Sequence, residues 1–240
     1  MSGTKRKRPA HLLLAQHLGV GIVEGRYAPG DLLPSEVSFA ASFGVSRGVL
    51  REALRTLAAK GLIESRPKTG TRIRDRRAWN LLDPELLGWV FDASPTLHFV
   101  QSLFQLRLIV EPAAAEIAAR RRNERQLAAM AAALETIGKH GLHSDLGRTA
   151  ESVFHELLLE ATDNELLVSL SSGISAAVRC ATLAKYRQGK PPLDATPVRA
   201  ALFGAIGNGD ASGARAAMMT LVQQAQSETE AAIKSAVARA

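Results

Sequence analysis

The chain has 240 residues, of which 46% are hydrophobic and only 5% aromatic, so it can bury an aliphatic core and is long enough for two domains. Its single cysteine, Cys180, excludes an internal disulfide and is expected to be buried. No apolar run approaches the roughly 20 residues that span a membrane. We therefore expect a cytoplasmic protein without membrane association. The net charge of +7 is unevenly distributed along the chain. Residues 1–80 hold 15 Lys and Arg against 6 Asp and Glu, whereas the other 160 residues hold 15 against 17. This asymmetry predicts a polyanionic partner for the N-terminal part.

The N-terminal part begins with a basic arm over residues 1–10, followed by a helix predicted over 12–25. Two further helices are expected to begin after Ser35 and Ser46, because a serine oxygen can cap the free N–H groups of a first helical turn. Gly44 turns the chain between them. This order predicts a helix-turn-helix.

The helix that follows Ser46 has two distinct faces. Apolar residues at a spacing of three and four must face a core, and this leaves Arg47, Arg51 and Arg55 on one outward row. Three guanidiniums on one face favour DNA as the partner.

A hairpin is predicted next, with strands over 62–66 and 71–74 joined by a turn over 67–70. Its basic side chains are Arg66, Lys68 and Arg72. Three helices and a basic hairpin make a winged helix-turn-helix, which we place at residues 11–75.

The residues from 22 to 63 carry a resemblance to the GntR family of bacterial transcription regulators. The matching pattern is Ile22-x2-Gly25-x-Tyr27-x-Pro29-Gly30-x2-Leu33-Pro34-Ser35-Glu36, then Gly44-Val45-Ser46-Arg47-x3-Arg51-Glu52-Ala53-Leu54-x2-Leu57-x3-Gly61-Leu62-Ile63. The resemblance implies that Arg47 and Arg51 read bases, commonly guanines, which a guanidinium fork can contact through O6 and N7. The chain departs from the family at Val37, where an arginine is usual. The candidate DNA-binding residues are Ser35, Ser46, Arg47, Arg51, Arg55, Arg66, Lys68 and Gly70.

Residues 76–95 form the predicted linker, with a short helix that Asp83 caps. The linker contains both tryptophans, Trp79 and Trp89, and is therefore expected to pack rather than to be flexible. Two roles remain open for these side chains: transmitting a change between domains, or only filling a seam between them.

From residue 96 to 240 the chain predicts an antiparallel all-α bundle, rich in Ala and Leu and without strand-like alternation. The expected helices lie near 96–121, 124–138, 145–161, 164–187, 195–208 and 211–237.

This second part resembles the FCD effector domain of the FadR branch of GntR regulators. The matching residues are Arg107-Leu108-x2-Glu111-Pro112-x2-Ala115-x2-Ala118-Ala119-Arg120, Phe154-His155-x2-Leu158, Ala161-x2-Asn164-x2-Leu167 and Ala205-Ile206-x2-Gly209-Asp210-x3-Ala214. The linker in particular looks like that of regulators of sugar-acid catabolism. The resemblance implies a small effector and a homodimer.

Many FCD domains hold a metal with an Asp, a His four residues later and two further His. The matching positions here are Glu151, His155, Arg199 and Leu221, and no histidine follows His155. We therefore expect no metal and no other cofactor; if a metal were bound, Glu151 and His155 would be its ligands. Arg199 instead suggests a metal-free pocket in which a guanidinium holds a carboxylate bidentately.

The candidate effector-binding residues are Arg107, Glu151, His155, Arg199, Arg179 and Tyr186. For Arg107 the alternative is a structural ion pair with Glu111, one helical turn away.

The sequence thus predicts a DNA-binding regulator that represses an operon for a small acid, a sugar acid by resemblance, and is released by its effector. A homodimer would present two recognition helices to double-stranded, palindromic operator DNA. The alternatives are another carboxylate effector (a keto, hydroxy or amino acid), an activator, or a DNA-binding protein without a ligand. A helical metal-dependent enzyme fused to a DNA-binding domain is the remote alternative, because no catalytic motif is present.

Overall fold

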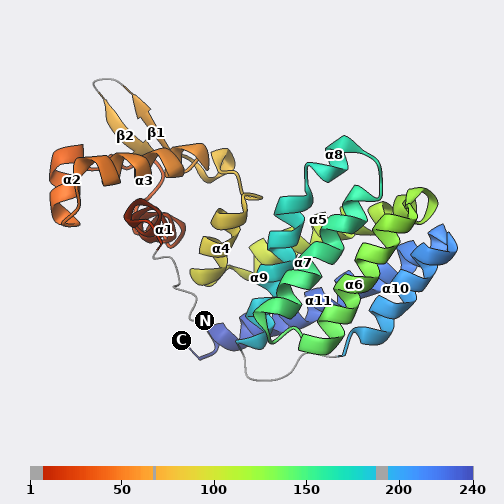
Figure 1. Cartoon of the computed structure of the whole chain (residues 1–240). Coiled ribbons are helices and arrows are strands. Elements are labelled where there is room, and N and C mark those ends of the chain that lie inside the picture. The colour runs from red at the N-terminus through yellow and green to blue at the C-terminus, as the bar shows by residue number, and fades with distance from the viewer. Residues whose placement is uncertain (1–7, 67–68, 188–193, 240) are drawn as a thin grey trace, which may run out of the picture. The chain divides into compact units, whose positions relative to one another are not determined.

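The computed structural model describes residues 8–66, 69–187 and 194–239, and the chain divides into two compact units between Ala93 and Ser94 (Figure 1). The first unit is the predicted winged helix-turn-helix with an additional helix, and the second is the predicted all-α bundle. Within the described ranges, no helix is both long and apolar enough to cross a membrane.

The first unit consists of helices and a two-stranded antiparallel sheet. Its elements are α1 (Ala10–Val23), α2 (Glu36–Ser42), α3 (Arg47–Ala59), β1 (Ile63–Arg66), β2 (Gly70–Ile73), the 3-10 helix η1 (Arg76–Ala78) and α4 (Pro84–Asp92). The order and boundaries of α1 to β2 follow the sequence pattern to within about two residues. The buried side chains of α1 and α3 include Leu18, Leu50 and Leu57, and α1 packs against α3 and α4.

Helix α4 belongs to the first unit. Asp83 caps it by accepting from the backbone N–H groups of Glu85 and Leu86, as the sequence predicted. Trp89 lies against Gly19 of α1, where a Cβ atom would approach Trp89 Cε3 to 2.2 Å. The predicted linker over 76–95 therefore lies almost wholly inside the compact unit, which extends to Ala93 rather than ending at residue 75.

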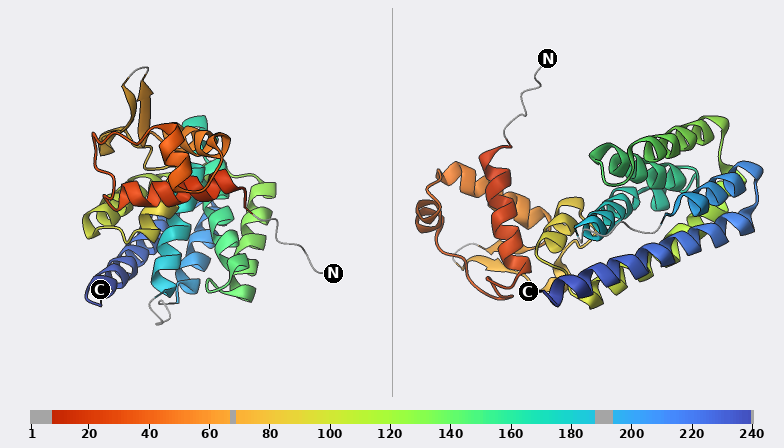
Figure 2. Two further views of the ribbon diagram at one scale, coloured as in Figure 1. Left: turned by 90° about the vertical axis from the view of Figure 1, so that its left-hand side faces the viewer. Right: turned by 90° about the horizontal axis from the view of Figure 1, so that it is seen from below.

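The second unit is built from helices alone. They are α5 (Leu97–Arg121), α6 (Glu124–His140), α7 (Asp145–Glu160), α8 (Glu165–Val168), α9 (Ser171–Tyr186), α10 (Thr196–Asn208) and α11 (Ala211–Val237). The two longest, α5 and α11, lie side by side (Figure 2), and α7 packs between α6 and α9. The predicted burial of Cys180 is confirmed.

One predicted helix is wrong, because residues 164–187 form two helices. The short α8 lies at the surface, where Leu166 is 80% exposed, so packing does not hold it in line with α9. The hydroxyls of Ser169 and Ser171 donate to carbonyls three residues earlier, and such local bonds compete with a continuous helix.

Candidate functional site

The three arginines of the recognition helix α3 are all exposed, as the sequence predicted. Arg51 Nη2 lies 3.0 Å from Glu36 Oε2 of the preceding helix, and Arg55 Nη1 lies 2.6 Å from Glu52 Oε1. Arg47 forms no ion pair with any residue that the structure describes. Its guanidinium is therefore available for a partner outside the chain.

Ser35 and Ser46 cap the two helices of the motif. The Ser35 Oγ atom accepts from Ser38 N–H, and the Ser46 Oγ atom accepts from Val49 N–H. Between the helices Gly44 has a φ of +61°, a conformation that glycine adopts without strain. These side chains fix where the recognition helix begins, and hence where Arg47 is presented.

The wing, formed by β1 and β2, is anchored in the core of the first unit at one end. Ile63 pairs with Ile73 in the antiparallel register, and both side chains are buried, whereas Arg66 pairs with Gly70 at the exposed end. Arg66 makes an exposed ion pair with Glu64 at 3.1 Å. Lys68, the other basic residue proposed for DNA contact, lies outside the described residues.

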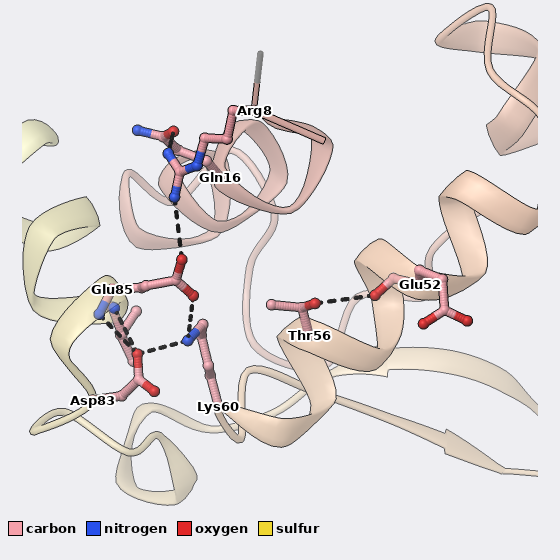
Figure 3. Close-up of polar contacts among 8 residues, drawn as sticks. Arg8, Gln16, Glu52, Thr56, Lys60, Asp83 and Glu85 are labelled. Atoms are coloured by element: carbon pink, nitrogen blue, oxygen red, sulfur yellow. Dashed lines mark hydrogen bonds and ion pairs between the residues drawn. The ribbon is translucent and has the colours of Figure 1, made fainter. Parts of the chain in front are cut away.

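A buried lysine joins the end of the recognition helix to α4 (Figure 3). Lys60 Nζ lies 2.7 Å from Asp83 Oδ1 and 2.9 Å from Glu85 Oε2, and Arg8 reaches Glu85 at 3.1 Å. Lys60 Nζ also lies 5.4 Å from the centre of the Trp89 ring. The recognition helix and α4 are thus fixed to each other by charge and by packing.

In the helical unit, four of the six predicted effector residues line one cavity of about 20 Å³. Arg107 comes from α5, Glu151 and His155 from α7, and Arg199 from α10, and all four side chains are buried. Residues far apart in the sequence are therefore brought to one place in the core of the bundle.

Arg107 and His155 both meet Glu111. Arg107 Nε donates to Glu111 Oε1 at 2.5 Å, which is the ion pair weighed above as the alternative for this arginine. His155 Nδ1 lies 2.6 Å from Glu111 Oε2 but outside hydrogen-bond geometry, so this buried nitrogen has no well-formed hydrogen bond. Burial raises the pKa of Glu111, but Arg107 and His155 together outweigh burial and hold the pKa at about 2.

Glu151 and Arg199 form a second buried pair, this time between helices. Arg199 Nη2 donates to Glu151 Oε1 at 2.6 Å, and the Thr182 hydroxyl of α9 donates to Oε2 at 2.9 Å. Burial raises the pKa of Glu151, but Arg199, His155 and Lys185 together outweigh burial, so the pKa is lowered. Glu151 is therefore a carboxylate at neutral pH.

A second cavity of about 270 Å³ adjoins the first, and Arg199, Lys185 and Ala195 line both. Tyr186, the fifth predicted residue, lines this larger cavity with Asp194 and Thr196. The sixth, Arg179, lines neither cavity; its Nη2 lies 3.5 Å from Asp145 Oδ1. It is a half-exposed residue of α9 that faces α7, so the structure does not group it with the others.

The sequence did not point to four polar residues that line the smaller cavity: Thr182, Lys185, Gln224 and Glu228. Lys185 Nζ lies 3.0 Å from Glu228 Oε2, which joins α9 to α11. The spacing of Thr182 and Lys185, three residues apart, places them on one helix face. Both residues follow Cys180 in a largely apolar helix, and polar residues in such a helix could have been predicted to face a polar site inside the bundle.

The residues at the positions of the FCD metal ligands do not fit a metal. Glu151 and His155 offer an oxygen and a nitrogen, but Arg199 is only a donor and Leu221 has no ligating atom. Across the described ranges, no group of three or more His, Cys, Asp or Glu residues is arranged to hold a metal ion. The guanidinium of Arg199 supplies a positive charge to this cavity.

Comparison with known proteins agrees with this two-unit architecture. Residues 13–73 match the family described as bacterial regulatory proteins, gntR family, and residues 102–224 match the FCD domain. A solved structure described by the words "Lar controls the expression of the Listeria monocytogenes agr system" has the same fold, with a TM-score of 0.65 at 19% identity over 94% of this chain and 98% of that one.

Two curated relatives are regulators of operons. The galactonate operon transcriptional repressor of Escherichia coli (strain K12) is 32% identical over 206 residues, which cover 85% of this chain and 90% of the relative. The Uxu operon transcriptional regulator of the same organism is 34% identical over 152 residues, covering 62% of this chain and 57% of the relative. The chain therefore belongs to the GntR family of bacterial transcription regulators, as a ligand-responsive DNA-binding regulator with an FCD domain.

Proposed function

We propose that this protein is a repressor of a sugar-acid catabolic operon, released from its operator when a sugar acid binds in the helical unit. The observation that carries the proposal is the buried Arg199 guanidinium, which lines both cavities. The resemblance described above assigns this position to a metal ligand. A planar guanidinium suits a carboxylate, because it can donate two parallel hydrogen bonds. The similarity to a galactonate operon repressor supports the polyhydroxy class of acid.

The DNA-binding half of the proposal rests on the recognition helix. Arg47 and Arg51 are exposed on α3, and the first 80 residues carry the positive charge of the chain. We infer that Arg47 and Arg51 contact bases, while Arg55, the capping serines Ser35 and Ser46, and the wing contact the backbone. A cytoplasmic homodimer presenting two such helices would read a palindromic operator.

The effector half needs no metal. Arg199, Arg107 and Lys185 supply the cationic groups of the cavity wall, and Glu151 and Thr182 supply acceptors for hydroxyl groups. A purified protein treated with a chelator is therefore expected to respond fully to its acid.

The test is operator release by defined acids. An operator is first selected from random-sequence DNA with the purified protein, and its binding is followed by fluorescence anisotropy with and without a chelator. Galactonate, gluconate, pyruvate, lactate and alanine distinguish sugar, keto, hydroxy and amino acids. Release by a sugar acid supports the proposal; tighter binding indicates an activator, and loss of the response on chelation would contradict the metal-free cavity. Light scattering on the free protein and on its DNA complex tests the homodimer.

A further inference from the structure

The guanidinium assigned to the effector already holds a carboxylate of the chain itself. Arg199 is 8% exposed, and its Nη2 lies 2.6 Å from Glu151 Oε1. The smaller cavity beside this pair has a volume of about 20 Å³, which is room for roughly one water molecule. The smaller cavity has no room for an effector carboxylate beside the intact pair, so a carboxylate that binds Arg199 from this cavity has to replace Glu151.

Arg199 is better placed for such an exchange than Arg107. Arg107 and Glu111 stand one turn apart on the same helix, so their pair forms within α5 and does not link two helices. Glu151 and Arg199 come from α7 and α10, and their contact is a link between two helices. Replacing Glu151 on Arg199 removes that link while the buried guanidinium keeps an anion.

The displaced carboxylate sets a requirement on the ligand. Glu151 Oε2 keeps the hydroxyl of Thr182 at 2.9 Å, but Oε1 loses its donor. The three cationic residues of the wall, Arg107, Lys185 and Arg199, are already paired with Glu111, Glu228 and Glu151, so an incoming anion adds uncompensated negative charge. A buried carboxylate oxygen needs a new donor in this situation, and a hydroxyl of the ligand can provide it.

We propose that Glu151 is an internal substitute for the effector carboxylate, and that the effectors are 2-hydroxy acids. The carboxylate of the acid replaces Glu151 on Arg199, the adjacent hydroxyl donates to Glu151, and the remaining chain lies in the 270 Å³ cavity beside Tyr186. Asp194 and Thr196 offer polar groups there for further hydroxyls. This inference rests on the proposed function and specifies the ligand class of the same site.

If the effector carboxylate replaces Glu151 on Arg199, the binding data should differ from those expected if Glu151 only contacted the ligand. A keto acid or a 2-deoxy acid can pair with Arg199 but leaves Glu151 without a donor, so the wild-type protein should discriminate against both. In Glu151→Gln the competing charge is removed and Arg199 is left without its anion. A plain carboxylate should then bind better than in the wild type, which is the opposite of what removal of a ligand contact would produce.

The experiment measures binding of galactonate, gluconate and their 2-deoxy analogues by isothermal titration calorimetry, with lactate and propionate as the smallest matched pair. We expect the wild type to bind the tighter of the two 2-hydroxy sugar acids with a dissociation constant about tenfold or more lower than that of its deoxy analogue. This factor corresponds to the loss of one hydrogen bond to a charged group. In Glu151→Gln we expect the deoxy acid to bind about tenfold more tightly than in the wild type, and the preference to fall below about threefold.

Glu160→Gln is the matched control, because it makes the same charge change at an exposed position at the end of α7. If circular dichroism shows that Glu151→Gln does not fold, Thr182→Val takes its place. This variant removes the hydroxyl that donates to Glu151 Oε2, so a displaced Glu151 depends more on the hydroxyl of the ligand. The preference for the 2-hydroxy acid should therefore rise, and an unchanged preference overturns the exchange.

An unchanged preference in Glu151→Gln, or a loss of affinity for both acids alike, overturns the exchange. That outcome leaves the proposed function standing if galactonate or gluconate still releases the wild-type protein from its operator. If no acid acts on the wild type, the proposed function itself fails.

Discussion

Lys60 and Asp83 join the end of the recognition helix to the start of α4, with Nζ of the lysine 2.7 Å from Oδ1 of the aspartate (Figure 3). The same oxygen caps α4 by accepting from the backbone N–H groups of Glu85 and Leu86. One carboxylate oxygen thus serves the buried lysine and the helix terminus together. The two helices are expected to lose stability together when either partner is removed.

Replacing the lysine tests this link. Lys60→Met leaves Asp83 without its cation and Glu85 with Arg8 alone, and should lower the free energy of unfolding by about 1–3 kcal/mol. Urea denaturation followed by tryptophan fluorescence measures it. Arg55→Ala is the control, because its pair with Glu52 is exposed and should contribute less than about 1 kcal/mol. Equal effects in the two variants would show that Lys60 has no special structural role.

The contact between Gly19 and Trp89 makes a second prediction about stability. Gly19→Ala places a Cβ atom 2.2 Å from Trp89 Cε3, so the tryptophan must move, at a cost of about 1–3 kcal/mol. Gly88→Ala on α4 meets no atom within 4 Å and should instead stabilise the helix by about 0.5–1 kcal/mol. Opposite shifts of the melting temperature confirm the packing; a neutral Gly19→Ala contradicts it.

Operator binding should separate the recognition helix from the wing. Arg47→Ala or Arg51→Ala should weaken binding to the selected operator far more than binding to random DNA, because base contacts carry about 1–3 kcal/mol of discrimination each. Lys68→Ala should weaken both and reduce the salt slope by about one unit. Anisotropy titrations at several salt concentrations measure these effects. The base-reading assignment is lost if all three variants bind operator and random DNA with equal losses.

The buried Glu111 should make stability depend on pH. Its pKa is lowered from 4.5 to about 2, so its ionised form stabilises the fold above pH 4.5, and this stability is lost as the pH falls from 4.5 toward 2. Glu111→Gln should therefore cost on the order of 3 kcal/mol at pH 7, with the difference from wild type shrinking below pH 4.5. Urea unfolding at pH 7, 5 and 3 measures this. A difference that stays constant with pH would show that the charge of Glu111 is not responsible.

Arg199 should be required for the response to acid and dispensable for binding DNA. Arg199→Ala removes a charge-assisted pair typically worth roughly 1.5–3 kcal/mol, so the thermal shift with galactonate or gluconate should disappear while operator affinity is kept. Arg199→His should not restore the response with zinc, nickel or manganese, because Leu221 still lacks a ligating atom. Stoichiometric metal in the untreated wild type, lost together with the response on chelation, would refute the metal-free site.

The helix termini could be read from the sequence because local chemistry decides them. Asn123 and Gln126 form a capping box at the start of α6, and Ser144 and Asp210 cap α7 and α11 by the same kind of bond. The break before α9 was missed because it depends on whether α8 packs, and packing is not a local property. For the same reason the sequence could name Glu151 and Arg199 as neighbours in a pocket but could not show that they pair with each other, 48 residues apart.

The packing of α4 determines where this regulator can be divided for engineering. A winged domain cut after residue 75 would lose Trp89, which covers Gly19, and both carboxylates around Lys60. A chimera that joins this DNA-binding unit to the effector domain of another protein should therefore keep the chain through Ala93 and place its junction at residues 93–96, between α4 and α5. Exchange after residue 75 would instead transfer an exposed apolar surface and an unpaired buried cation along with the recognition helix.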